Sequence, residues 1–362
     1  MTIDLYCEVY TALQHCYGQY SVQRETAALQ NDYALMQGNA SAASIGGGNS
    51  FSVIGVSGLG KSTALQRVLS LFPQVIEHTK YHGQNFYYHQ IPYLVVQTPH
   101  DASIKALILD IYLQIDGLLG TSYQRDALAR RLSIDVLVSQ LNLIVRSNHI
   151  GLLVIDELQN ICYRNCETGT RFLNFLVQLI NGTGVSVCMV GTPRVLQILQ
   201  QEFRSARRTT GLVYDRLAND KEYSLLLHGL WHYQYTRYAT DLTVEMQNWL
   251  YRKTQGIPDI LVKLLYSAQK QAILDGRETL DYEIFECAYL KNLGMVSEYM
   301  SELSQTPLVK NAPKPAAELP AIQRKTAVIT GDDLRLLLKK AKRSGTPPVI
   351  AYADYIKGEV TL

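Results

Sequence analysis

The stretch 55-GVSGLGKST-63 decides the fold of this chain. Its residues fit the spacing G-x-x-x-x-G-K-[ST], which requires an apolar strand before the loop and a helix after it. Both neighbours are present, because 51–56 reads FSVIGV and 61–71 has the apolar spacing of a helix. The stretch therefore predicts a loop that closes around phosphate groups.

Each residue type in this loop has a chemical reason to be there. The glycines allow backbone N–H groups to close around a β-phosphate, and Lys61 neutralises charge on the β- and γ-phosphates. The hydroxyl of Ser62 can bind Mg²⁺. The sequence thus predicts ATP and Mg²⁺ as ligands, and the residues expected to hold the nucleotide are Gly55, Ser57, Gly58, Gly60, Lys61, Ser62 and Thr63.

Strand and helix patterns alternate downstream of the loop. Short apolar runs without a polar face are typical of central strands in a parallel sheet, and they occupy 51–56, 91–98, 151–157 and 185–192. Helical spacing occupies 61–71, 103–117, 134–147 and 170–181. The prediction is an α/β fold, a three-layer αβα domain with a parallel sheet.

Composition divides the chain into four segments. Residues 1–50 read as an N-terminal arm or small helical subdomain with a linker, and 51–235 as the αβα domain. Residues 236–300 have only helical spacing and predict a small all-helical lid. Six of the 11 prolines lie beyond position 306, so 301–362 predicts a flexible, basic tail that binds a partner or merely aids solubility.

An acidic pair ends the third predicted strand. Asp156 is expected at the carboxyl edge of the sheet, where it can hold Mg²⁺ together with Ser62. Glu157 follows directly and can orient and polarise an attacking water. Two solvated acids at a strand end would be the structural alternative, and a small-molecule kinase would carry lid arginines instead. The pair favours ATP hydrolysis.

The next strand and the segment after it add further candidates. Thr192 can contact the γ-phosphate or the water, or can serve only as an N-cap for the turn that begins at Pro193. Three arginines then follow closely, either as a solvated face or as the source of an arginine finger for a neighbouring subunit's ATP. They are Arg204, Arg207 and Arg208.

Charge and hydropathy limit the partners. The formal net charge is only +2, so any binding of nucleic acid must use a local patch. No apolar run approaches the roughly 20 residues that span a bilayer, so no membrane contact and a cytoplasmic location are expected.

The order of these motifs resembles the AAA+ ATPases. A more specific set resembles the TnsC family, the ATP-dependent regulators of target-selecting bacterial transposons that are related to MuB. That set comprises FPQVIEHTKYHG (72–83), TPHDASIKALILDIYLQIDGLLGTSY (98–123), VIDELQN (154–160) and FRSARRTTG (203–211). The resemblance covers about residues 51–290.

This resemblance implies an ATPase that forms a ring or helical homo-oligomer, of six or seven subunits per turn, around double-stranded DNA. It implies a link between a targeting protein of the TniQ/TnsD kind and a TnsA/TnsB-like DDE transposase, with hydrolysis disassembling or remodelling the oligomer. The positions that match the family's DNA contacts are Lys105 and Thr121. The lid departs from the superfamily, because GIPDILVK lacks the early arginine; Asp259 cannot take its role, and Lys263 is a candidate substitute. The same resemblance implies a nucleoid-associated location in a bacterium.

Two other functions fit the same motifs. A helicase loader or initiator-like ATPase would share the sheet and the binding of DNA. A nucleotide-gated scaffold that does not hydrolyse ATP is disfavoured by Glu157.

Overall fold

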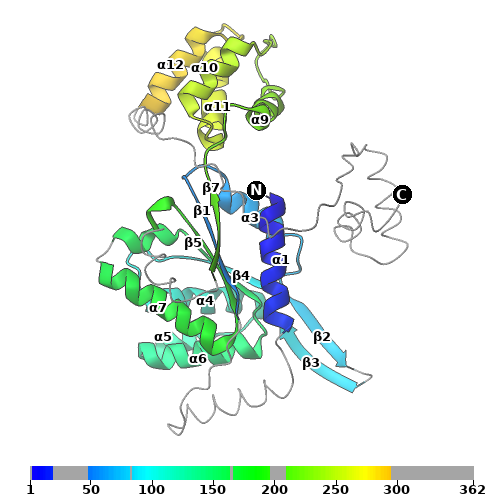
Figure 1. Cartoon of the computed structure of the whole chain (residues 1–362), viewed down its shortest axis with the longest axis vertical. Coiled ribbons are helices and arrows are strands. Elements are labelled where there is room, and N and C mark those ends of the chain that lie inside the picture. The colour runs from blue at the N-terminus through cyan, green and yellow to red at the C-terminus, as the bar shows by residue number, and fades with distance from the viewer. Residues whose placement is uncertain (1, 19–47, 82–83, 164–165, 196–208, 295–362) are drawn as a thin grey trace, which may run out of the picture. The chain divides into compact units, whose positions relative to one another are not determined.

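A parallel five-stranded sheet forms the middle layer between two sets of helices (Figure 1). The structure, a computed structural model, describes residues 2–18, 48–81, 84–163, 166–195 and 209–294. Along the sheet the strands are β4 (Tyr93–Gln97), β5 (Leu152–Asp156), β6 (Ser186–Gly191), β1 (Ser50–Gly55) and β7 (Thr209–Tyr214). The four strands predicted from the sequence are confirmed, each shifted by at most two residues at either end.

The register of the strands places the predicted motifs at one edge. Ile54 of β1 pairs with Gly191 of β6, and Gln97 of β4 pairs with Asp156 of β5. β1 and β6 are buried along their whole length, which explains why their sequences are apolar without alternation. Since all five strands run in parallel, their carboxyl ends meet at this edge.

Helices cover both faces of the sheet (Figure 1). One face carries α4 (Ile104–Leu119), α5 (Tyr123–Ala129), α6 (Ile134–Ser147) and α7 (Cys166–Thr183), which share one apolar core with the sheet. The other face carries α1 (Thr2–Gly18) and α3 (Lys61–Leu69). The predicted three-layer αβα fold is therefore confirmed.

The helix α1 contributes to the apolar core on the same face of the sheet as α3. Its buried side chains include Leu5 and Val9, which pack in one cluster with Phe51 of β1 and Val190 of β6. The Ser186 hydroxyl donates a hydrogen bond of 2.9 Å to the carbonyl of Ala12. The start of the chain is thus a covering helix of the αβα layers, rather than only an arm.

Two features were absent from the sequence prediction. β2 (Ile76–Tyr81) and β3 (Gln84–Gln90) pair as a separate antiparallel hairpin. β7 is an edge strand of the main sheet, next to β1. The hairpin strands carry polar residues on both sides, so neither shows the apolar run of a buried strand. β7 begins with two threonines and a glycine, which weakens its pattern.

A second apolar core lies in the helices that follow β7. They are α9 (Lys221–Trp231), α10 (Val244–Thr254), α11 (Pro258–Leu274) and α12 (Tyr282–Leu293). Each helix contributes buried side chains to this core, among them Trp231, Leu250, Leu264 and Phe285. We call α9–α12 the helical cluster. It includes α9, which precedes the lid boundary predicted at 236.

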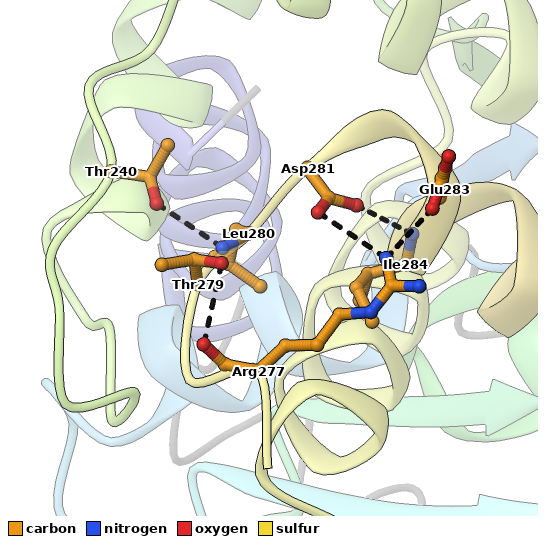
Figure 2. A network of polar contacts seen from close by, with 7 residues as sticks. All are labelled: Thr240, Arg277, Thr279, Leu280, Asp281, Glu283 and Ile284. Carbon is orange, nitrogen blue, oxygen red and sulfur yellow. Dashed lines mark hydrogen bonds and ion pairs between the residues drawn. The ribbon is translucent and has the colours of Figure 1, made fainter. Parts of the chain in front are cut away.

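A polar network fixes the start of α12 (Figure 2). Asp281 caps the helix, and Arg277 forms ion pairs with Asp281 at 3.6 Å and with Glu283 at 2.8 Å. The backbone N–H of Leu280 donates to the Thr240 hydroxyl at 3.1 Å. The network ties the loop before α10 to the loop before α12.

Among the described residues, no helix combines the length and the apolar character needed to cross a membrane. The predicted tail, 301–362, lies outside the described residues.

Candidate nucleotide-binding site

The loop between β1 and α3 has the backbone of a phosphate cradle. Gly58 and Gly60 have φ angles of 82° and 81°, in the left-handed region that favours glycine. Gly60 is the N-cap of α3 and makes no side-chain cap, so the first N–H groups of the helix point toward the loop. Ser57 and Thr63 are exposed beside it. This geometry suits an anionic ligand.

The Lys61 side chain folds back over the loop. Its ammonium donates to the carbonyl of Gly55 at 2.9 Å and to that of Val56 at 3.0 Å. Burial lowers the pKa of Lys61 below its ordinary value, and the carboxylates of Asp156 and Glu157 oppose this effect. A cation held at this edge favours the binding of negative charge.

The lowered pKa predicts how stability depends on pH. As the pH rises through this pKa toward the ordinary lysine value of about 10.4, the folded state releases the proton before the unfolded chain does. The free energy of unfolding of the wild-type protein should therefore increase relative to that of Lys61→Met, which has no titrating group there. Urea denaturation without nucleotide, from neutral pH to about pH 10, measures the difference; a constant or decreasing difference contradicts the prediction.

Asp156 and Ser62 meet at the end of β5. The Ser62 hydroxyl donates to Asp156 Oδ2 at 2.6 Å, and Oδ1 accepts from the N–H of Glu157 at 2.7 Å. The backbone carbonyl of Asp156 accepts two bonds from Thr98, at the end of β4. A hydroxyl and a carboxylate are oxygen ligands of the kind that Mg²⁺ takes, so this pair fits the predicted ion.

Glu157 begins the turn that follows β5. Its φ is 55°, an unusual value for a residue with a side chain, and the side chain is exposed. The 3₁₀ helix η1 (Leu158–Tyr163) follows, and Gln159 in it donates a hydrogen bond to Glu157 Oε2. Glu157 therefore lies next to the Ser62–Asp156 pair, and Gln159 forms a hydrogen bond with its carboxylate.

Thr192 directly follows β6 at the same edge. As an N-cap, its hydroxyl oxygen would accept a hydrogen bond from a backbone N–H of the turn η2 (Pro193–Val195). Among the described residues, however, the buried Thr192 Oγ1 has no hydrogen-bond partner, and the N–H of Val195 donates to the backbone carbonyl of Thr192 instead. An unpaired buried hydroxyl beside the loop fits a ligand oxygen better than a structural cap.

Thr192→Val keeps the side-chain shape and removes only this hydroxyl. The free energy of unfolding should stay unchanged or rise by up to about 1 kcal/mol, because no hydrogen bond is lost. ATP turnover should fall roughly tenfold or more if the hydroxyl stabilises the reacting phosphate. Denaturation and steady-state turnover of the variant test both; reduced stability with full turnover would instead support the N-cap role.

The helical cluster contacts the phosphate loop directly. The N–H of Asp259, in the first turn of α11, donates to the carbonyl of Gly58 at 3.1 Å. Lys263, the substitute considered for a lid arginine, forms an ion pair with Asp259 at 2.6 Å. The Lys263 ammonium is therefore bound to the side chain of the residue whose backbone contacts the loop.

The two predicted DNA contacts already have partners within the chain. The Thr121 hydroxyl donates to Asp116 Oδ1 at 2.5 Å, and Asp116 also accepts the N–H groups of Tyr123 and Gln124. Lys105 Nζ lies 3.4 Å from the carbonyl of Leu132. Their contact with DNA stays a prediction.

The arginines proposed as a finger lie outside the described residues; they are Arg204, Arg207 and Arg208.

Sequence reasoning missed three residues at this site. Gln159 and Asn160 follow the acidic pair, and Asn160 Nδ2 donates to the carbonyl of Thr98 at 2.8 Å. Asp259 was considered only as a residue that cannot replace the lid arginine. A polar residue two positions after the predicted base was the available signal for Gln159, whereas the contact of Asp259 with Gly58 depends on tertiary structure.

Comparison with known proteins places the loop and the acidic pair in one domain. Residues 45–199 match the AAA domain family. No curated protein matches the chain.

Three solved structures resemble the chain at low identity. The Walker-type ATPase of Pyrococcus abyssi is 14% identical with a TM-score of 0.44, and the match covers 70% of each chain. The Aeropyrum pernix ORC1 protein in complex with DNA is 15% identical with a TM-score of 0.46, over 74% of this chain and 64% of that one. The ADP form of the Aeropyrum pernix ORC2 protein is 14% identical with a TM-score of 0.42, over 76% and 68%.

Proposed function

We propose that this protein is an ATPase whose bound nucleotide controls its assembly on double-stranded DNA. The observation that carries the ATPase activity is the 2.6 Å contact between Ser62 of the phosphate loop and Asp156 of β5, with Glu157 next in sequence. A loop that only held phosphate would have no need of an acid pair at this position. The AAA domain match over residues 45–199 supports the same conclusion.

The residues of the site divide the chemistry between them. The loop N–H groups and Lys61 hold the phosphates of ATP, while Ser62 and Asp156 hold Mg²⁺. Mg²⁺ supplies positive charge that neutralises the developing charge on the transferred phosphoryl group. Glu157 accepts a proton from the attacking water and orients it, and Thr192 donates its hydroxyl to a phosphate oxygen or the water.

An arginine from a neighbouring subunit completes this proposal. One of Arg204, Arg207 and Arg208 stabilises transition-state charge in the next subunit's site, which makes turnover depend on assembly. The contact of Asp259 with Gly58 gives the helical cluster a direct connection to the nucleotide loop. Nucleotide binding and subunit arrangement are then coupled through the same loop.

The role in DNA transposition rests on the sequence resemblance to the TnsC family. In this role the oligomer surrounds duplex DNA through phosphate contacts that do not read sequence, with Lys105 and Thr121 as contributors. Thr121 must then share its hydroxyl with Asp116 or leave it. The oligomer links a TniQ/TnsD-like targeting protein to a TnsA/TnsB-like transposase, and hydrolysis releases it.

The experiment compares ATP turnover and oligomer size with and without duplex DNA. We expect DNA to increase both, and a purified DDE transposase to stimulate turnover further. If duplex DNA changes neither quantity, assembly on DNA is excluded. Stimulation by a replicative helicase instead of a transposase would identify a helicase loader or initiator-like ATPase.

A further inference from the structure

Gln159 is the only residue whose side chain is seen to hold the Glu157 carboxylate among the described residues. Its amide nitrogen Nε2 donates a hydrogen bond to Glu157 Oε2. Its other amide atom, Oε1, is buried and has no hydrogen-bond partner within the described part of the chain. An unpaired buried carbonyl is unfavourable, so the amide is held in this orientation against a penalty.

The element that carries Gln159 is itself firmly placed. Leu158 and Ile161 of η1 are fully buried, on either side of Gln159. Asn160 bonds to Glu157 through its N–H at 3.0 Å and to Thr98 through its side chain at 2.8 Å. Gln159 therefore projects from a turn that is anchored to the ends of β4 and β5.

The Gln159 amide also lies against the end of β6. A Cβ placed on Gly191 would lie 3.5 Å from Gln159 Oε1, and Gly191 directly precedes Thr192. One side chain thus lies between the predicted base and the strand end that carries Thr192. That distance is an ordinary van der Waals contact, so the amide and the backbone of Gly191 are direct neighbours.

We propose that Gln159 is a positioning residue that holds the Glu157 carboxylate in its productive orientation. This inference rests on the proposed function, because it takes Glu157 as the group that activates water. Glu157 is exposed, so its carboxylate would otherwise sample several rotamers in solvent. A catalytic group displaced by about 1 Å can lose roughly 10²-fold in rate.

Gln159→Met tests the inference with a side chain of similar length that cannot donate. We expect kcat for ATP to fall by roughly 10- to 100-fold, while KM and the affinity for ATP change by no more than about twofold. Gln159→Glu should lower kcat at least as far, because a second carboxylate repels the first. Gln140→Met on α6 makes the same change at a partly buried glutamine outside the site and should keep full turnover.

A double-mutant cycle separates positioning from a general structural role. In a Glu157→Gln background, Gln159→Met should cause no further loss of turnover, because both changes act on one group. Losses that multiply would overturn the inference, as would unchanged kcat in Gln159→Met. Thermal unfolding should be unaltered in Gln159→Met, since the substitution also removes the unpaired Oε1.

A measurement without nucleotide supplies a second readout. The side-chain amide signal of Gln159 in a ¹⁵N correlation spectrum, assigned by its loss in Gln159→Met, should shift in Glu157→Ala. An unshifted signal overturns the inference even if the protein is an active ATPase. Absence of turnover in the wild-type protein, with Lys61→Ala and Glu157→Gln equally silent, would overturn the proposed function and this inference together.

Discussion

Lys61→Ala is expected to abolish ATP-dependent assembly on duplex DNA. The ammonium is partly buried and lies at the loop carbonyls of Gly55 and Val56, where a phosphate chain would meet it. Removing a buried charge partner costs about 2–5 kcal/mol, so the affinity for ATP should fall by roughly 30-fold or more. Titration with a fluorescent ATP analogue measures the affinity, and light scattering with duplex DNA measures assembly.

Arg67→Ala provides the matched control for Lys61→Ala. Arg67 is an exposed cation in the last turn of the same helix, α3, away from the phosphate loop. This variant should bind ATP and assemble as the wild-type protein does. A Lys61→Ala protein that assembles normally would refute the description of the loop as the nucleotide-dependent control of assembly.

Glu157→Gln is expected to separate assembly from hydrolysis. The amide keeps the size of the side chain but cannot accept a proton from water, so kcat should fall by about 10²- to 10⁴-fold. Binding of ATP should remain, because the loop, Lys61 and the Ser62–Asp156 pair are untouched. The variant should therefore form ATP-bound oligomers on DNA that persist for longer than those of the wild-type protein.

The control for this variant is Glu222→Gln, which alters an exposed acid in the first turn of α9. Turnover and disassembly should both stay normal in it. If Glu157→Gln keeps wild-type turnover, Glu157 is not the base. If it loses turnover but its oligomers disassemble at the wild-type rate, hydrolysis does not drive release.

Local sequence patterns were sufficient to predict the phosphate loop and every strand of the main sheet except β7. The loop requires a strand before it and a helix after it, and both are found, with α3 starting at Lys61 as expected. The helix predicted over 134–147 has those bounds in the structure, because its apolar residues recur at the spacing of one helix face. The meeting of Ser62 with Asp156 followed from the general rule that parallel strands end at one edge.

Long-range contacts explain what the sequence did not predict. α1 packs on the sheet because Leu5 and Val9 contact residues of β1 and β6. A local sequence pattern cannot predict this contact. The engagement of Thr121 by Asp116 depends on the turn between α4 and α5. Likewise, the first turn of α11 meets Gly58 across some two hundred residues of sequence.

The central claim is that bound ATP drives assembly of this chain on duplex DNA. Sedimentation velocity of the Glu157→Gln protein, with and without ATP and with a DNA duplex of defined length, tests this directly. Large, uniform complexes are expected only when ATP and duplex are both present, and they should be lost in Glu157→Gln/Lys61→Ala. Complexes of the same size without ATP, or a monomer under all conditions, would contradict it.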